Sequence, residues 1–306
     1  MTYAEHLTDL IGKTPLIKLG RLSEETGNLV LAKAEFMNPG SSIKDRAAYY
    51  MITNAEKQGA ISSGSIIVEP SGGNTGIALA LVCSVKGYRL ILTMPDSTCP
   101  ERQKLLKAMG AEVVLTPAAA GSGGAIRKAE EIAASLSGSY IPMQFSNSSN
   151  PESHYQTTGP EIWADTDGKI DWFVAASGTG GTLTGCSTYL KKNRETIKIA
   201  AVEPWESSVI SGEPAGDHRI HGTGPGFIPE NLHRSLLDRV IRVRTEDAEI
   251  MARKLVESEG LFTGVSSAAN VCAAAIISEH EKNKGLVIVT ILCDSGERYL
   301  SAGIFD

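Results

Sequence analysis

Residues 66–94 read IIVEPSGGNTGIALALVCSVKGYRLILTM, and this stretch decides the fold class of the chain. It begins with a short apolar run, Ile66 to Val68, and continues through a glycine-rich turn into a helical pattern over Thr75 to Val85. A second apolar run follows from Arg89 to Met94. Two short apolar runs joined by a helix of this length predict a parallel strand–helix–strand unit.

The same alternation extends outward from this unit along most of the chain. We therefore predict an α/β fold of two domains, each with a twisted, mostly parallel sheet flanked by helices. The other predicted strands are Glu112 to Leu115, Trp172 to Ala176, Ile197 to Val202, Val240 to Val243 and Leu286 to Leu292. The other predicted helices are Pro100 to Met109, Ala125 to Leu136, Thr182 to Lys192 and Ala268 to Ser278, and a further helix begins near Asp45.

Composition excludes several classes of protein. A net charge of -6 argues against broad binding of nucleic acid, which needs clustered positive charge. The five cysteines are scattered, and no CxxC pair or His/Cys cluster predicts a metal site. The first ten residues lack the layout of a signal peptide, and no apolar stretch approaches the length of a membrane span. We therefore expect reduced thiols and a cytoplasmic protein.

Two glycine-rich turns each lie between a predicted strand and a predicted helix. The first is Glu69 to Gly76, and the second is Ser177 to Thr182. Backbone N–H groups at the start of a helix bind anions, so both turns are candidate ligand sites. The second turn is equally consistent with a glycine-rich connection that binds nothing. It matches neither a Walker loop nor a GxGxxG fingerprint, which disfavours a nucleotide site.

Three other positions carry chemistry that the local sequence does not decide. Lys44, in NPGSSIKDR (38–46), is either a surface lysine or an amine whose lowered pKa suits a Schiff base. Ser266, in GLFTGVSS (260–267), is either a helix cap or a site residue. His154, beside Tyr155, is the histidine nearest to a candidate site, although a packed or surface histidine is the favoured interpretation.

Taken together, seven segments resemble one enzyme family. In chain order they read NPGSSIKDR, EPSGGNTG, QFSN, SGTGGT, HGTGPGFIP, GLFTGVSS and SGERYLS. This order is similar to that of the O-acetylserine sulfhydrylases (cysteine synthases), which are pyridoxal-phosphate enzymes of fold type II, the tryptophan synthase β-like type. The resemblance extends from Ile11 to Phe305. One such segment alone is a weak signal, whereas seven in order specify fold and cofactor.

The resemblance implies a role for particular residues around pyridoxal 5'-phosphate. Lys44 resembles the Schiff-base lysine, Asn74 the residue that binds the 3'-oxygen, and Ser266 the serine that faces the pyridine nitrogen. The phosphate loop would be Gly178, Thr179, Gly180, Gly181 and Thr182. The residues that would bind substrate are Ser71, Gly72, Asn74, Thr75, Gln144 and Gly222, the last on the sulfur-donor side. No metal is implied.

The resemblance also implies a reaction and a domain arrangement. O-acetyl-L-serine would lose acetate to give an α-aminoacrylate, to which sulfide adds to form L-cysteine, with Lys44 moving the α-proton. A serine rather than an acid at the pyridine nitrogen favours β-elimination over transamination. The smaller, mobile domain with the substrate loop is expected over 41–146. The larger domain, which binds the cofactor phosphate, is expected over 1–40 plus 147–306.

Departures from the family pattern leave alternatives open. Ser71 and Gly72 stand where the family usually has Thr and Ser, Ala268 replaces a glycine, and the segment 293–295 reads Cys-Asp-Ser. One alternative is a sister β-replacement enzyme, such as a cystathionine β-synthase, β-cyanoalanine synthase or diaminopropionate-type synthase. A minor alternative is an inactive homologue that serves as a binding partner. The family also implies a homodimer and binding of the C-terminus of a serine acetyltransferase.

Overall fold

The structure is a computed structural model that describes residue 1 and residues 3–306. The chain forms two compact units: unit 1 comprises Met1–Ile11 and Lys44–Ser149, and unit 2 comprises Gly12–Ile43 and Asn150–Asp306. The chain thus leaves unit 1 between Ser149 and Asn150, within a stretch rich in serine and asparagine. The expected mobility of a domain over residues 41–146 stays a prediction.

Unit 1 is built on a parallel sheet of four strands in the order β5-β4-β3-β6. The strands are β3 (Ile66–Glu69), β4 (Arg89–Pro95), β5 (Glu112–Thr116) and β6 (Ser139–Tyr140). The strand–helix–strand prediction is confirmed, because α3 joins β3 to its parallel neighbour β4. The strand β6 was not predicted, since two residues leave no recognisable pattern.

Alternate residues of these strands pack against different helices. Ile67 and Leu92 belong to one apolar cluster with residues of α2, α3 and α4, whereas Val68 and Ile91 pack with Ala129 of α5 on the other side. This alternation follows from the two-residue period of a strand. The helices of unit 1 are η1 (Leu7–Leu10), α2 (Lys44–Lys57), α3 (Asn74–Lys86), α4 (Pro100–Ala108), η3 (Ala118–Ala120) and α5 (Gly121–Ser135).

Unit 2 contains a six-stranded sheet in the order β1-β2-β10-β7-β8-β9, in which only the β1–β2 pair is antiparallel. The mostly parallel α/β fold that the sequence predicts is therefore confirmed. The strands are β1 (Leu16–Lys18), β2 (Leu29–Ala34), β7 (Trp172–Ala176), β8 (Lys198–Pro204), β9 (Arg239–Val243) and β10 (Val287–Leu292).

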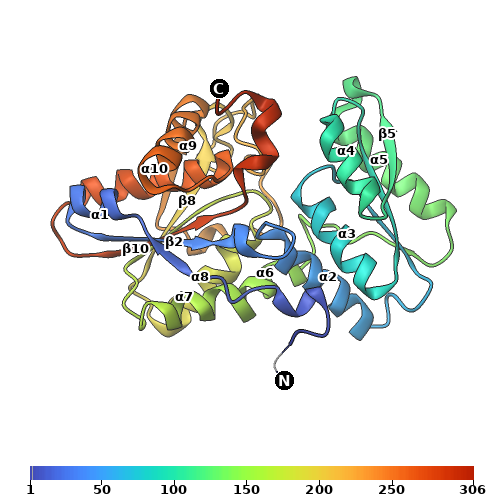
Figure 1. The fold of residues 1–306 in the computed structure, drawn as a ribbon, viewed down its shortest axis with the longest axis horizontal. Helices are drawn as coiled ribbons and strands as arrows, with labels where there is room; N and C mark the ends of the chain where they lie inside the picture. Colours follow the sequence, from blue (N-terminus) through green and yellow to red (C-terminus); the bar gives the residue numbers. More distant parts are fainter. Residues whose placement is uncertain (2) are drawn as a thin grey trace. The chain divides into compact units, whose positions relative to one another are not determined.

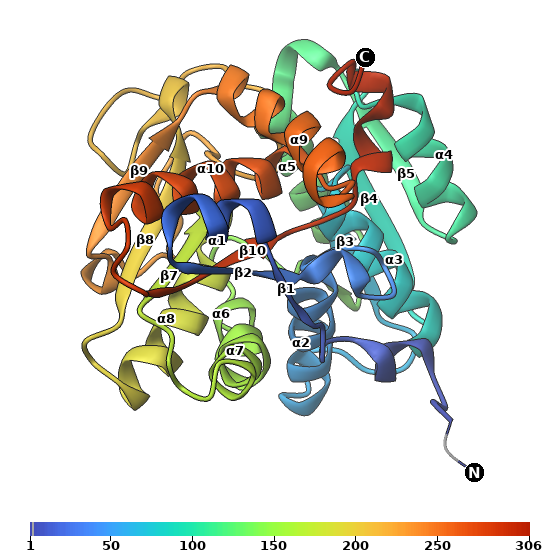
Figure 2. The same cartoon turned by 60° about the vertical axis from the view of Figure 1, so that its left-hand side comes forward.

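Helices cover both faces of this sheet. In Figures 1 and 2, α9 and α10 lie along one face and α7 and α8 along the other. The apolar clusters show the same two faces. Val174 packs with residues of α9 and α10, and its neighbour Phe173 packs with residues of α7 and α8. The helices are α1 (Gly20–Thr26), η2 (Glu35–Met37), α7 (Gly159–Asp165), α8 (Gly181–Asn193), η5 (Trp205–Ser207), η6 (Arg234–Leu236), α9 (Thr245–Glu259), α10 (Val265–His280) and η7 (Gly296–Ala302). A short helix, α6 (Ser149–Ser153), and the π-helical turn His154–Thr158 precede α7.

The strand β2 was missed by the sequence analysis because a lysine interrupts its apolar run. Lys33 is fully buried, and its ammonium group lies 3.0 Å from a carboxylate oxygen of Glu161 and 3.1 Å from one of Asp165. A buried charge is tolerated when it is paired in this way. No helix among the described residues is long and apolar enough to cross a membrane.

Candidate active site

Each unit presents its glycine-rich turn at the carboxyl edge of a parallel sheet. In unit 1, β3 pairs with β4 on one side and β6 on the other; in unit 2, β7 pairs with β8 and β10. Strands at which the chain order reverses in this way leave room for a ligand beyond their carboxyl ends. The two turns predicted from the sequence follow β3 and β7, and each leads directly into a helix.

In unit 2, three glycines of the turn after β7 lie so close to neighbouring segments that an added side chain would meet another atom. A Cβ atom on Gly178 would lie 2.1 Å from the carbonyl oxygen of Gly222. Gly180 has a positive φ of 80°, and a Cβ on Gly181 would lie 2.0 Å from Oδ1 of Asn150. The glycines therefore permit close backbone approach. The structure also brings Gly222 against the predicted phosphate loop.

The same turn has hydrogen-bond donors available for an anion. Among the described residues, none accepts a hydrogen bond from the backbone N–H of Gly178, Thr179 or Gly180. The buried hydroxyl of Ser177 likewise has no partner in the described part of the chain. These donors lie at the start of α8, where the helix dipole also favours negative charge. This donor set fits a phosphate group.

Two side chains from the segment before α7 orient the threonines of this turn. Nδ2 of Asn150 donates to the hydroxyl of Thr179 at 2.9 Å. Nε2 of His154 lies 3.3 Å from the hydroxyl of Thr182, and its Nδ1 lies 2.9 Å from that of Thr158. His154 is buried, so the favoured packed interpretation holds, yet it contacts Thr182 of the predicted phosphate loop. Asn150 was missed because its partner is 29 residues away.

Ser266 lies at the start of α10, on the same sheet edge. The neighbouring hydroxyl of Ser267 accepts a hydrogen bond from the backbone N–H of Cys293 at 2.8 Å, which ties the helix start to the end of β10. Because Gly264 occupies the N-cap, the alternative that Ser266 is a helix cap is wrong. The Ser266 side chain is buried, and no described residue takes part in a side-chain hydrogen bond with it. Its hydroxyl is therefore available to a ligand.

In unit 1, the turn after β3 is held by Ser71. Its hydroxyl accepts hydrogen bonds from the backbone N–H of Gly73 at 3.4 Å and of Gly76 at 3.2 Å. Asn74 is the first residue of α3, directly after the N-cap glycine. The hydroxyl proton of Ser71 is donated to no described residue, so it can bind an incoming anion.

The structure brings Gln144 to this turn from beyond β6. The hydroxyl of Thr75 donates to Oε1 of Gln144 at 2.6 Å, and both side chains are buried. The contact follows from the topology, because β3 and β6 are parallel neighbours whose carboxyl ends meet at one edge. The predicted association of Gln144 with the Ser71–Thr75 segment therefore has a geometric basis within unit 1.

Gly72 has a local explanation in the neighbouring strand. A Cβ atom on Gly72 would lie 3.1 Å from the sulfur of Met94 and 3.1 Å from Cγ2 of Thr98. A serine at this position would therefore require the Met94 and Thr98 side chains to shift by a few tenths of an ångström. Met94 and Thr98 pack against Gly72 and leave little room for a side chain there, which explains why this turn has no second hydroxyl.

Lys44 is the first residue of α2 and is half-buried. The backbone before it is fixed in unit 2, because the N–H of Ile43 donates to the carbonyl of Cys293 at 2.9 Å. Ser41 adopts a positive φ of 56°, which turns the chain just before this point. The lysine therefore begins its helix from a constrained segment.

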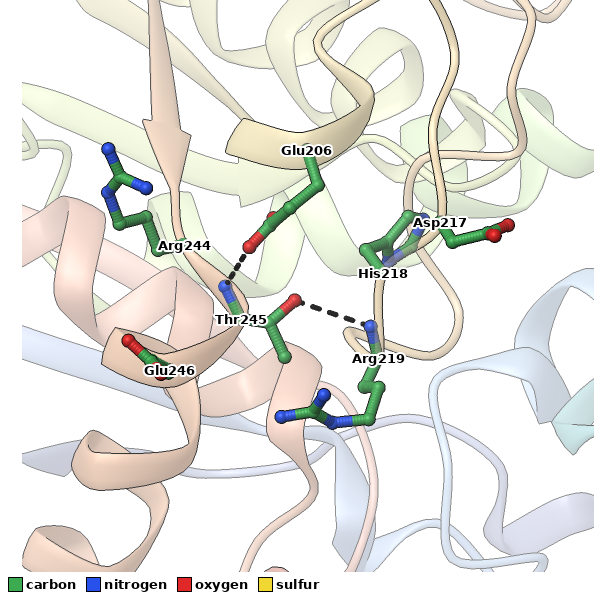
Figure 3. A pocket seen from close by; sticks show the side chains of 7 residues that line it. All are labelled: Glu206, Asp217, His218, Arg219, Arg244, Thr245 and Glu246. Carbon is green, nitrogen blue, oxygen red and sulfur yellow. Dashed lines mark hydrogen bonds between the residues drawn. The ribbon is translucent and has the colours of Figure 1, made fainter.

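A charged pocket in unit 2 is separate from these residues (Figure 3). It encloses about 410 Å³ and is lined by Glu206, Asp217, His218, Arg219, Arg244, Thr245 and Glu246. Glu206 accepts a hydrogen bond from the N–H of Thr245 at 2.9 Å, and the Thr245 hydroxyl accepts one from the N–H of Arg219 at 3.3 Å. None of the predicted site residues lines it. The described residues also contain no group of three or more side chains that could hold a metal ion.

Comparison with known proteins identifies the family. Residues 7–294 match the model of a family described as pyridoxal-phosphate dependent enzyme. The chain belongs to this family. Its cofactor is thus pyridoxal 5'-phosphate, as the resemblance implied.

The chain is also similar to individual proteins with names. The chain is 50% identical to cysteine synthase A of Escherichia coli over 304 residues, covering 96% of this chain and 93% of that protein. A crystal structure of cysteine synthase from Entamoeba histolytica superposes with a TM-score of 0.96 at 39% identity, covering 99% of this chain and 91% of that one. An O-acetylserine dependent cystathionine β-synthase from Helicobacter pylori superposes with a TM-score of 0.93 at 38% identity, covering 100% of both chains.

Proposed function

We propose that this enzyme replaces the acetate group of O-acetyl-L-serine with sulfide, giving L-cysteine and acetate. The observation that supports this most directly is the anion cradle after β7. It combines unbonded backbone donors, the orphaned Ser177 hydroxyl and the close approach of Gly178 to Gly222. The similarity to cysteine synthases over nearly the full chain supports the choice of substrates.

For the cofactor, we assign the phosphate to the turn Gly178–Thr182 and the aldehyde carbon to the amine of Lys44. Asn74 would donate to the 3'-oxygen, and the Ser266 hydroxyl would face the pyridine nitrogen. The donors after β7 and the buried Ser266 hydroxyl, which bonds to no described residue, support these assignments. A serine hydroxyl does not protonate the ring nitrogen as a carboxylic acid would, and this favours loss of a β-substituent.

For the substrate, we assign the α-carboxylate to the turn after β3. The Ser71 hydroxyl can donate to this carboxylate, and the backbone N–H groups at the start of α3 lie at the positive end of a helix dipole. Thr75 and Gln144, which already share a hydrogen bond, would complete the contact together with Asn74. We assign Gly222, with Gly72, to the remaining wall of the substrate site.

When bound, the cofactor supplies an electron sink for the bond to the substrate's α-carbon. The chain itself contributes the transfer of a proton from and to the α-carbon of the substrate. Nζ of Lys44 removes the α-proton, holds it while acetate leaves, and returns it to the α-carbon after sulfide has added. The turn after β3 keeps the substrate oriented between the two halves of the reaction.

The test separates the two halves of the reaction. With O-acetylserine alone, the enzyme should release about one acetate per active site, because the mechanism stops until a nucleophile arrives. Adding sulfide should restore continuous release of acetate and formation of L-cysteine. Lys44→Ala should lose at least about 100-fold in turnover, the range expected for removing a general base. Full turnover by that variant would refute the assignment.

A second candidate is transfer to homocysteine, the reaction class of a cystathionine β-synthase. It is favoured by the similarity to the Helicobacter pylori enzyme and by Gly72, whose missing side chain alters the substrate turn. Presenting sulfide and L-homocysteine in competition decides between the two. The proposal expects cysteine as the main product, and predominant formation of cystathionine would replace it with the second candidate.

We also propose the assembly and location that the family implies. The enzyme would act in the cytoplasm as a homodimer, and the C-terminus of a serine acetyltransferase would bind to it as a partner. Light scattering at micromolar concentration should give about twice the mass of the 306-residue chain. A synthetic acetyltransferase C-terminal peptide should inhibit competitively with O-acetylserine, and a peptide without its last residue should not.

A further inference from the structure

Glu69 ends β3 and lies immediately before the substrate turn. Its side chain is 1% exposed. One carboxylate oxygen accepts a hydrogen bond from the N–H of Met143 at 3.1 Å, and the other accepts one from the N–H of Gln144 at 3.4 Å. None of the ion pairs among the described residues includes Glu69. The acid is therefore buried with two backbone amides as its hydrogen-bond donors.

The turn that Glu69 holds contains a residue with a strained backbone conformation. Met143 has a positive φ of 60°, a backbone conformation that residues other than glycine adopt only at a cost in free energy. Its carbonyl accepts hydrogen bonds from the N–H groups of Ser146 at 3.0 Å and Asn147 at 2.9 Å. A strained turn of this kind persists only where the surrounding structure fixes it. Glu69 fixes the backbone N–H groups of Met143 and Gln144.

The same turn carries Gln144, whose side chain accepts the 2.6 Å hydrogen bond from Thr75. A continuous path thus leads from Glu69 through the backbone of residues 143–144 to the Gln144 amide and on to the start of α3. Every contact in this path lies within unit 1. The path therefore connects the segment that follows β6 both to the end of β3 and to the start of α3.

The choice of an acid at this position needs a reason. Burial without a basic partner raises the pKa of Glu69 to about 7, and the two amide donors lower it only in part. A neutral side chain would avoid this cost of burial. Only a carboxylate, however, can offer one acceptor oxygen to each of two adjacent N–H groups without presenting a donor to either.

We propose that Glu69 is a positioning residue for the reaction: it fixes the Met143–Gln144 backbone so that Gln144 orients Thr75 and the substrate carboxylate turn. The inference rests on the proposed function, since it takes that turn as the substrate site. Glu69 itself touches neither substrate nor cofactor. Its effect is expected on amino-acid binding rather than on cofactor binding or on the affinity for sulfide.

The chain offers a matched control in Glu203. This glutamate is also buried near the end of a strand and followed by a proline. It accepts hydrogen bonds from the N–H groups of Ile210 at 2.8 Å and Ser211 at 3.1 Å, and a further one from the Ser211 hydroxyl at 2.5 Å. Glu203→Gln therefore removes the same kind of interaction at a place outside the substrate turn.

The experiment compares the steady-state constants of Glu69→Gln and Glu203→Gln with those of the wild-type holoenzyme. Glu69→Gln should raise KM for O-acetylserine about tenfold, the effect of losing one charge-assisted hydrogen bond, with the cofactor absorbance and the KM for sulfide unchanged. Glu203→Gln should leave KM for O-acetylserine within about twofold. An unchanged KM in Glu69→Gln, or an equal rise in both variants, overturns the proposal.

A second measurement keeps this inference separate from the proposed function. Hydrogen exchange of the peptide that spans residues 141–147 should be at least about tenfold faster in Glu69→Gln than in the wild type, with no change in Glu203→Gln. This result does not depend on turnover, so it stands even if the wild type fails to release acetate from O-acetylserine. Unchanged exchange contradicts the inference. If Glu69→Gln does not fold, Glu69→Asp carries the same tests with smaller expected changes, and unchanged values in that variant overturn it.

Discussion

Two buried glutamates of this chain, Glu69 and Glu203, hold turns. Glu69 and Glu203 each use their two oxygens to accept backbone N–H groups from a segment that lies beyond their own strand. For Glu69 the cost appears as a pKa of about 7, and the neighbouring Tyr140, itself raised in pKa by burial, is pushed further up by the Glu69 charge. Burial of the Glu69 carboxylate therefore lowers the free energy of unfolding of the protein.

Glu69 should make the free energy of unfolding depend on pH. Its pKa rises from 4.5 in the unfolded chain to about 7 in the folded one, so the folded state binds more protons between these values. Stability should therefore fall as pH rises from about 4.5 to 7, by about 3 kcal/mol, and then level off. The free energy of unfolding can be measured with denaturant at several pH values for the wild type and for Glu69→Gln. The difference between the two should fall with this slope, and a difference that does not change with pH would contradict the prediction.

Gly178 should be required for the cofactor site. In Gly178→Ala the added methyl group would meet the Gly222 carbonyl at 2.1 Å, so one of the two backbone segments must move. The dissociation constant for pyridoxal phosphate should rise by at least about tenfold. Gly123→Ala in α5 is the control, because its methyl group meets only Nη1 of Arg127 at 3.5 Å, and stability should rise slightly. Normal cofactor binding by Gly178→Ala would be contrary to the account.

Some of these residues could be predicted from the sequence and others could not. Lys44 and the Gly178–Thr182 turn lie in short patterns that the local sequence leaves open between a ligand site and a structural role. The order of seven such segments, and its resemblance to one family, nominated them. Glu69 and Asn150 act on partners 74 and 29 residues away, and their roles exist only once the strands have paired. The position of Gln144 was nominated by resemblance, and its hydrogen bond to Thr75 supplies the physical reason.

At the scale of elements, the two candidate turns share one design. Each follows an inner strand of a parallel sheet, and each opens a helix whose N-cap is a glycine, Gly73 before α3 and Gly180 before α8. The sequence predicts these helices well because their apolar faces are continuous. It misses β2, where Lys33 breaks the apolar pattern, and β6, which is too short to carry one.

The start of α8 should depend on the segment before α7. Asn150→Ala removes the donor to Thr179 and should weaken binding of pyridoxal phosphate by about five- to tenfold, the effect of roughly one buried hydrogen bond. Asn193→Ala at the exposed end of the same helix removes a bond to the Tyr189 carbonyl and should leave cofactor binding unchanged. Fluorescence titration of the apoenzyme measures both. Equal affinities for the two variants would show that Asn150 does not organise the loop.

At the scale of the whole molecule, the proposed cofactor residues come from two separately packed units. Lys44 belongs to unit 1 and the turn Gly178–Thr182 to unit 2, and the proposal assigns both to one cofactor. Family membership over residues 7–294 supports a single enzyme rather than two independent domains. The identity of the lysine that holds the cofactor is therefore the point on which the rest depends.

Reduction of the holoenzyme with borohydride, followed by peptide mass mapping, tests this point most directly. The account predicts one phosphopyridoxyl group per chain, carried by the peptide that contains Lys44 and absent from Lys44→Ala. An adduct on any other lysine, or a reduced protein without the adduct, would contradict it.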